Sequence, residues 1–170
     1  MIIIIDGYNF MMASTHFGEF AELEKNRKRI ISALSRYHEM KDHPIILVFD
    51  AYKSGNIHET KEGIGNIEVI YTKLGETADA KIINLAEVHR EKALIITADK
   101  EIIKKSENFG ASTLSSEEFA AKLIQTTMME DMPFGKEEDD EEDYSSKKQK
   151  GNPHKLSKKE RTKLKKVKKL

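Results

Sequence analysis

The 170-residue sequence contains no cysteine. This absence excludes disulfide bonds, catalysis by a thiolate and zinc sites with cysteine ligands. It agrees with a reducing compartment. Long apolar segments are absent too, because the run at residues 2–5 ends at Asp6 and no stretch approaches the ~18 apolar residues of a membrane span. The sequence therefore predicts a soluble protein with neither a signal peptide nor a membrane contact.

A net charge is absent as well, but the zero total hides three segments of different charge. Residues 1–127 contain 16 Lys and Arg against 19 Asp and Glu, a net charge of −3. Residues 128–144 have a net charge of −8, and residues 145–170 one of +11. This separation predicts a globular domain, a disordered acidic linker and a basic C-terminal tail, in that order. We expect the tail to be disordered, or helical once it binds a partner.

Apolar runs rich in β-branched residues alternate with amphipathic stretches along residues 1–127. Strands are predicted at residues 2–5, 45–49, 67–71, 93–97 and 111–114. Helices are predicted at 20–40, at 77–90, from 100 to Gly110, and from a Ser115–Glu118 capping box to 124. Residues 51–66, with three glycines, are predicted to be a loop. The alternation favours a three-layer α/β/α fold, Rossmann-like, with a central, mainly parallel sheet.

Acidic side chains follow four of the predicted strands. Asp6 and Asp50 end the first two strands, Asp79 follows the third after a short turn, and Asp99 follows the fourth. The carboxyl ends of parallel strands meet at one edge of a sheet, where ligands bind. Crowded carboxylates repel one another unless a cation neutralises them, and oxygen ligands favour Mg²⁺ or Mn²⁺. The pattern predicts a metal site that readies a water for attack on a phosphodiester.

Each of these acids also has a purely structural interpretation. Asp6 opens a common turn pair, Asp50 and Asp99 are suited to capping, and Asp79 complements a helix dipole. For Asp99 alone, capping is the better explanation. The metal-site hypothesis therefore depends on the four acids occurring together, with no nucleophilic side chain and no glycine-rich phosphate loop beside them. The supporting polar residues are Asn9, Glu76 and Thr97.

Four motifs connect these acids to a known family. They are Ile5-Asp6-Gly7-Tyr8-Asn9, Val48-Phe49-Asp50-Ala51, Thr72-Lys73-Leu74-Gly75-Glu76-Thr77-Ala78-Asp79 and Ile96-Thr97-Ala98-Asp99. With these motifs in this order, residues 1–127 resemble the YacP-like branch of the NYN domains, relatives of the PIN-domain nucleases. The resemblance implies a PIN-like fold and an Mg²⁺- or Mn²⁺-dependent endoribonuclease in the bacterial cytoplasm. Ribosome association and mRNA turnover are the leading roles in that family.

The resemblance also assigns residues. It implies that Asp6, Asp50, Asp79 and Asp99 are the catalytic metal ligands, with Asn9 as a neighbour and Glu76 as a weaker match. Relatives often have a hydroxyl residue directly before the last acid, where this chain has Ala98. That difference leaves open which hydrogen bonds support the fourth acid.

Basic residues beside the motifs and in the tail are predicted RNA contacts, because Lys and Arg neutralise phosphates without reading bases. Those beside the motifs are Lys53, Lys73, Lys81 and Lys100. Those in the tail are Lys158, Lys159, Arg161, Lys163, Lys165 and Lys166. Ordinary surface lysines are an equal alternative for the first group. For the second, the alternatives are a tail with no specific contact and an arm that contacts a membrane surface or another protein.

Two other functions stay open at the level of sequence. One is a non-catalytic RNA- or ribosome-binding module with the same fold. The other is an α/β phosphohydrolase that acts on a small phosphorylated metabolite, with Asp6 as nucleophile. The commonest scheme of that kind needs a second Asp two residues later, where this chain has Tyr8.

Overall fold

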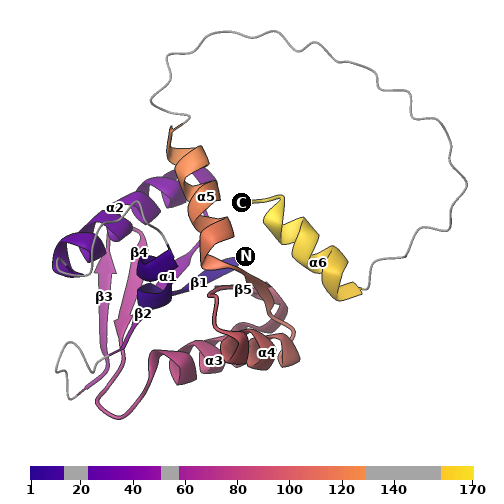
Figure 1. Ribbon diagram of the computed structural model, residues 1–170, viewed down its shortest axis with the longest axis horizontal. Coiled ribbons are helices and arrows are strands. Elements are labelled where there is room, and N and C mark those ends of the chain that lie inside the picture. Colours follow the sequence, from indigo (N-terminus) through magenta and orange to yellow (C-terminus); the bar gives the residue numbers. More distant parts are fainter. Residues whose placement is uncertain (14–22, 51–57, 129–157) are drawn as a thin grey trace, which may run out of the picture.

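The computed structural model describes residues 1–13, 23–50, 58–128 and 158–170, which surround a six-stranded sheet (Figure 1). The strands are β1 (Ile2–Asp6), β2 (Ile45–Phe49), β3 (Thr60–Ile64), β4 (Ile67–Tyr71), β5 (Ala93–Ile96) and β6 (Ser112–Leu114). The helices are α1 (Gly7–Ala13), α2 (Leu23–Lys41), α3 (Ala78–His89), the 3-10 helix η4 (Arg90–Lys92), α4 (Lys100–Asn108), α5 (Ser116–Met128) and α6 (Lys158–Val167).

The strands lie in the order β3-β4-β2-β1-β5-β6. Within the described sheet β3 alone runs antiparallel, and the other neighbours pair in parallel. β1 lies in the middle, where Ile4 is in register with Ile46 of β2 and Ile95 of β5. Side chains of these central strands are buried on both faces, which is why they read as continuous apolar runs. The prediction of a mainly parallel α/β/α fold is confirmed.

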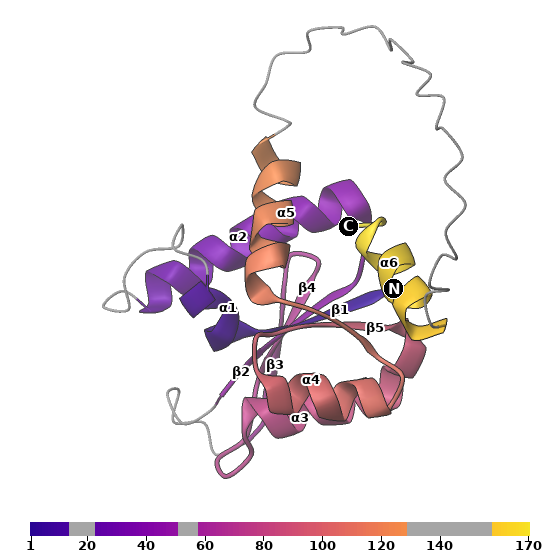
Figure 2. The same ribbon diagram turned by 45° about the vertical axis from the view of Figure 1, so that its right-hand side comes forward.

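The sheet separates two hydrophobic cores, one on each face (Figure 2). Alternate residues of β1 face opposite ways, so Ile3 and Ile5 join one core and Ile4 the other. The first core is covered by α1, α2 and α5, and the second by α3 and α4. Phe119 of α5 contacts the ring of Tyr37 in α2, with 5.5 Å between centroids. Packing on these two cores fixes the positions of the helices around the carboxyl ends of the strands.

The structure corrects the predicted loop at residues 51–66. Residues 51–57 lie outside the described part of the chain, but Thr60–Ile64 form β3, antiparallel to β4. The two strands are joined at Gly65, whose φ of +60° is a conformation that favours glycine. The strand escaped prediction because its side chains are mostly exposed at the sheet edge and show no apolar alternation.

Helix α1 was also not predicted, and it depends on a close backbone approach. It begins at Gly7, directly after β1. A Cβ atom at this position would lie 2.6 Å from Cδ1 of Phe49 in β2, well inside van der Waals contact. Only glycine therefore lets α1 pack this closely on β2, and the packing holds Asn9 above the end of β1.

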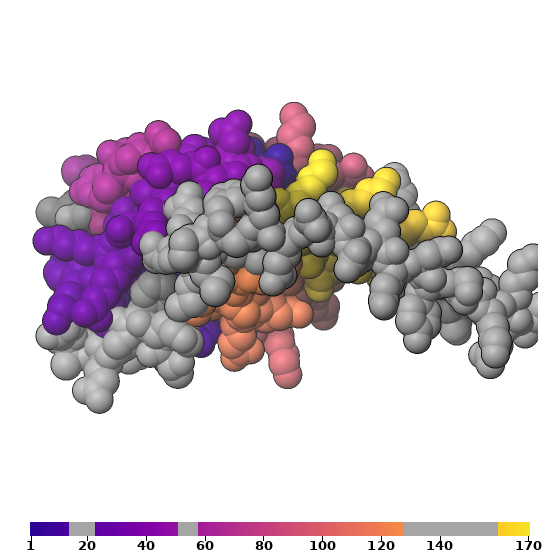
Figure 3. Space-filling view, turned by 90° about the horizontal axis from the view of Figure 1, so that it is seen from above, coloured from indigo at the N-terminus to yellow at the C-terminus, as the bar shows by residue number. Residues whose placement is uncertain are grey.

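The C-terminal segment differs from the predicted basic tail. Residues 158–170 form α6 and a final turn that pack on the domain, with Leu170 buried in the first core. The hydroxyl of Tyr37 donates to the carbonyl of Leu170 over 3.3 Å, and Lys166 Nζ donates to the carbonyl of Ala93 over 2.7 Å. In the space-filling view α6 lies at the surface beside α5 (Figure 3). These residues are thus part of the fold, because their few apolar side chains reach its core.

Most of the predicted acidic linker, residues 129–144, lies outside the described part of the chain. Among the described helices, none combines the length and the apolar character needed to cross a bilayer.

Candidate active site

The candidate site lies where the chain leaves β1 and β5 toward opposite faces of the sheet. After β1 the chain enters α1 on one face, and after β5 it enters α4 on the other. In open α/β sheets, ligands bind outside the carboxyl ends of the strands at such a divergence. Asp6 is the last residue of β1, and Thr97 comes directly after β5. The hydroxyl of Thr97 donates to Asp6 Oδ2 over 3.3 Å. The fold therefore brings the first and fourth predicted motifs together.

Asp6 is the buried acid of the site, with 7% of its surface exposed. Besides the bond from Thr97, its Oδ1 accepts a hydrogen bond from the backbone N–H of Asn9 over 3.1 Å. The two bonds hold both oxygens of the carboxylate and fix its plane.

Asn9 ties three segments of the chain together. Its side-chain Oδ1 accepts hydrogen bonds from the backbone N–H of Ala98 over 2.9 Å and from the hydroxyl of Ser116 over 2.7 Å. These bonds join α1, the loop after β5 and the first turn of α5. Asn9 is therefore a positioning residue, and Ser116 is a partner that sequence reasoning missed because 107 positions separate the two.

Asp99 has the capping role that the sequence favours for it alone. Its Oδ1 accepts hydrogen bonds from the backbone N–H groups of Glu101 over 2.7 Å and of Ile102 over 3.1 Å, which begins α4. The N–H of Asp99 in turn donates to the hydroxyl of Thr97 over 3.1 Å. Thr97 thus supports both acids, and it supplies a hydroxyl where Ala98 has none.

The acids act on one another electrostatically. The pKa of Asp6 is raised from 3.8 to about 6 in total: burial raises it most, the hydrogen bonds from Asn9 and Thr97 lower it, and the charges of Asp79 and Asp99 raise it. The pKa of Asp79, in the first turn of α3, is raised by partial burial, then by Asp99 and by Asp50. All four predicted acids therefore lie within electrostatic reach of at least one other.

The donor chemistry of the site suits a hard divalent cation. The interacting groups are carboxylates, which offer oxygen ligands only. The pKa values of Asp6 and Asp79 are raised by desolvation and by repulsion between the acids, and a bound cation would offset both effects. Within the part of the chain that the structure describes, no three acidic or histidine side chains form a ready coordination group. The residues thus match the cation in charge and ligand type, and they are not preassembled around it.

The remaining residues predicted beside the motifs differ in their exposure and in their contacts. Glu76 lies in the turn before α3, where its N–H donates to the carbonyl of Lys73 over 3.0 Å, and its charge is not among the causes of the raised pKa values. Lys73 and Lys100 are exposed near the acids. Lys81 is largely covered and forms an ion pair with Glu59, which makes it a poor phosphate contact. Lys53 lies outside the described residues.

The predicted RNA contacts of the tail also include both exposed and buried side chains. Arg161, Lys163 and Lys165 are exposed on α6. Lys166 is buried, with its ammonium group bonded to the carbonyl of Ala93, so its prediction as a phosphate contact is wrong. The side chains of Lys158 and Lys159 are outside the described part.

Comparison with known sequences places the chain in a family. The model of the YacP-like NYN domain matches residues 3–169. The chain belongs to the YacP-like NYN domain family. The match continues through α6, so the family's domain extends beyond the boundary at residue 127 that the sequence predicted. This agrees with the packing of α6 and Leu170 on the core.

The relatives are YacP proteins of Bacillus subtilis. The YacP protein of strain 168 is 33% identical over 88 residues, a stretch that covers 51% of this chain and 51% of the relative. The aligned stretch thus spans about half the length of that relative. The crystal structure of Rae1 (YacP) is 25% identical, with a TM-score of 0.64 over 77% of this chain and 78% of the solved chain. A mutant of Rae1 (YacP) is also 25% identical and gives 0.63 over 75% and 77%.

Membership of the YacP-like NYN family has a coarse functional meaning. It indicates a PIN-like nuclease domain. NYN and PIN-like nucleases generally use divalent metal ions. The acids at the ends of β1 and β5 and at the start of α3 are the part of this chain with matching chemistry.

Proposed function

We propose that the protein is an Mg²⁺- or Mn²⁺-dependent endoribonuclease whose active edge is formed by Asp6, Asp50, Asp79 and Asp99. One observation carries the proposal: Asp6 is a buried carboxylate whose pKa of about 6 is raised by burial and by two neighbouring acids. Such a group is unfavourable for folding, and binding of a divalent cation offsets the cost. The same shift is common where carboxylates serve chemistry.

The residues have distinct roles in this proposal. Asp6, Asp79 and Asp99 hold the ion, and Asp50 adds negative charge next to Asp79. When bound, the ion readies a water for attack on the phosphodiester and stabilises the charge of the leaving oxygen. Thr97 and Asn9 keep Asp6 in one orientation through their hydrogen bonds to its two oxygens.

The substrate we propose is messenger RNA, with the ribosome as its place of cleavage. This part follows from the family resemblance and from Lys73 and Lys100, whose exposed side chains follow two of the acidic strand ends in sequence and are suited to neutralising phosphates. Sequencing of RNA ends after incubation with translating ribosomes and Mn²⁺ tests it. We expect new ends that are absent with Asp6→Asn.

Cleavage of a labelled RNA by the purified full chain tests the nuclease itself. We expect Asp6→Asn to lower the cleavage rate in Mn²⁺ by at least about a hundredfold, the scale on which transition-state charge stabilisation is lost. The matched control is Asp42→Asn, because Asp42 is exposed at the opposite edge of the sheet and its φ of +51° suits asparagine. This control should cleave at the wild-type rate.

Two results would contradict the assignment. Equal cleavage by the wild type, Asp6→Asn and Asp42→Asn would exclude Asp6 from the reaction. RNA binding that survives EDTA, with no cleavage by the wild type of any RNA supplied, would instead support a non-catalytic binding module with the same fold.

A further inference from the structure

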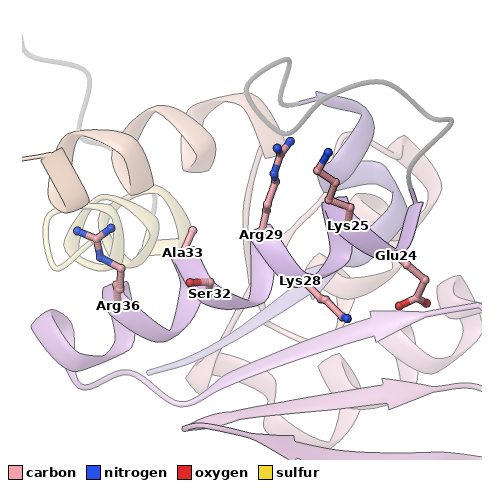
Figure 4. Close-up of a pocket in the computed structure, with 7 residues that line it drawn as sticks. All are labelled: Glu24, Lys25, Lys28, Arg29, Ser32, Ala33 and Arg36. Atoms are coloured by element: carbon pink, nitrogen blue, oxygen red, sulfur yellow. The ribbon is translucent and has the colours of Figure 1, made fainter.

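We propose that the outer face of α2 binds the phosphate backbone of RNA. That RNA is the polyanion rests on the proposed function. The feature is a row of exposed cations around an open hollow of about 660 Å³ (Figure 4). Its basic members are Lys25, Lys28, Arg29 and Arg36, and its remaining lining residues are Glu24, Ser32 and Ala33.

The row follows from the helical periodicity of α2. Ile30, Leu34 and Tyr37 face the first core and are fully buried. Positions 25, 29, 32 and 36 recur every three to four residues on another side of the helix, which leaves them exposed. In Figure 4 the side chains of Lys25 and Arg29 rise from the same side of α2. The fold therefore gathers these positive charges without using them in its core.

The charge of the hollow is strongly one-sided. Four of its seven lining residues are basic and one, Glu24, is acidic. Glu24 forms an ion pair with Arg27, a residue on the sheet side of the helix. The single negative charge is thus already engaged, and the surface retains an excess of positive charge that attracts a polyanion.

The row begins near the active edge. The guanidinium group of Arg27 lies 4.9 Å from the ring centroid of Phe49 and 5.1 Å from that of Tyr71. These rings belong to the last residues of β2 and β4, and Asp50 follows directly after β2. The first turns of α2 are therefore next to the strand ends that lead to the acids.

The shape of the row suits an extended chain. From Lys25 to Arg36 the helix rises ~16 Å at 1.5 Å per residue. A small anion would occupy one part of such a row, whereas a nucleic-acid backbone can contact it along its length. The basic side chains of the described lining neutralise phosphates without reading bases. We expect binding that is independent of base sequence and strongly dependent on salt.

The test is RNA binding by the full chain in EDTA, measured by the fluorescence anisotropy of a labelled single-stranded RNA at several salt concentrations. The variant is Lys25→Gln/Arg29→Gln, because glutamine has nearly the same helix propensity as lysine and arginine. The matched control is Lys92→Gln/Lys104→Gln, which removes two exposed cations from η4 and α4. We expect the α2 variant to bind roughly fivefold or more weakly at low salt, with a salt slope lower by about 1. The control should stay within about twofold of the wild type.

Three outcomes would overturn the proposal. One is wild-type affinity of the α2 variant, and another is an equal loss in the control, which would reflect total charge alone. The third is stronger competition by an acidic polypeptide than by RNA, which would identify a protein partner instead. If Lys25→Gln/Arg29→Gln lowers the melting temperature, Arg29→Gln/Arg36→Gln replaces it in the same comparison.

The result is distinguishable from failure of the proposed function, because EDTA separates binding from cleavage. Weaker binding by the α2 variant, with no cleavage by the wild type in Mn²⁺, would retain the RNA surface and reject the nuclease. Normal cleavage by the wild type with unchanged RNA affinity of the α2 variant would retain the nuclease and reject the RNA surface on α2.

Discussion

Asp6 combines two demands that oppose each other. The hydrogen bonds from Asn9 and Thr97 favour its charged form, and burial together with Asp79 and Asp99 disfavours it. The effects that disfavour the charged form are the larger ones, as the rise of the pKa of Asp6 to about 6 indicates. Raised pKa values are common where carboxylates serve binding or chemistry, so this balance supports the metal-binding role proposed for Asp6.

The raised pKa predicts how stability depends on pH. The folded state holds the proton of Asp6 more tightly than the unfolded state, so the stabilisation is complete below pH 4 and is lost as the pH rises to about 6. The shift corresponds to about 3 kcal/mol at neutral pH. Urea unfolding in EDTA from pH 4 to 8 should show the wild type losing up to this amount relative to Asp6→Asn.

Asp42→Asn is the control for this comparison, because it removes an exposed carboxylate from the other edge of the sheet. It should keep the pH dependence of the wild type. Parallel stability curves for the wild type and Asp6→Asn would show that Asp6 has an ordinary pKa.

At the scale of single residues, the sequence predicted the positions of the acids better than the hydrogen bonds and charges around them. Asp6 and Asp99 could be placed because each follows a recognisable strand. The double role of Asp99, as a helix cap and as a charge acting on Asp6, could not be separated from the sequence. Ser116 could not be found at all, because its bond to Asn9 exists only after α1 and α5 pack side by side.

At the scale of elements, α6 is the largest difference between the prediction and the structure. Half of its ten residues are lysine, which indicates a solvated tail. The residues that attach it to the domain are Lys166 and Leu170, and neither belongs to a clear apolar stripe. Burial of a lysine stem and of a single leucine depends on the surface that receives them, which the sequence does not describe.

The docking of α6 predicts a contrast between two leucines. Leu170 is buried in the first core, whereas Leu164 is 47% exposed. We expect Leu170→Ala to lower the free energy of unfolding by about 2 to 3 kcal/mol, because it removes apolar contacts and leaves a cavity. Leu164→Ala should change it by no more than about 0.5 kcal/mol. Urea unfolding of both variants measures the difference, and equal effects would mean that this segment does not pack on the domain in solution.

Unlike the docking of α6, most strands could be predicted from the sequence, and the reason is physical. All five parallel strands were placed correctly, and four of them because their apolar, mostly β-branched runs are buried in the sheet. β3 escaped because an exposed edge strand needs no apolar pattern. Sequence patterning therefore reports burial, and it fails for elements that are held by pairing alone or by one or two anchors.

For the whole molecule, separation of charge is the main property that the zero net charge conceals. Acids gather at the end of β1, β5 and the start of α3, while exposed cations line α2 and α6. A polyanion is attracted to the helices and repelled from the acids, unless a cation is bound there. Metal binding and RNA binding should therefore favour each other.

Metal addition should stabilise the entire fold. A ligand that binds only the folded state adds about 2.7 kcal/mol at a hundredfold excess over its dissociation constant. We expect Mn²⁺ to raise the unfolding midpoint of the wild type and of Asp42→Asn, and to have much less effect on Asp6→Asn. Thermal unfolding at pH 7.5 with and without the ion provides the measurement, and an equal rise in all three proteins would remove Asp6 from the ligands.

The buried ammonium group of Lys166 makes the docking of α6 visible to chemistry. Because its Nζ is bonded to the carbonyl of Ala93 and shielded by the domain, an amine-reactive label reaches it only in molecules whose last helix has come away. Lys163 and Lys165, on the same helix, are exposed and react in either state. The ratio of labelling at these neighbours, read by mass spectrometry, thus reports the fraction of molecules with a detached helix.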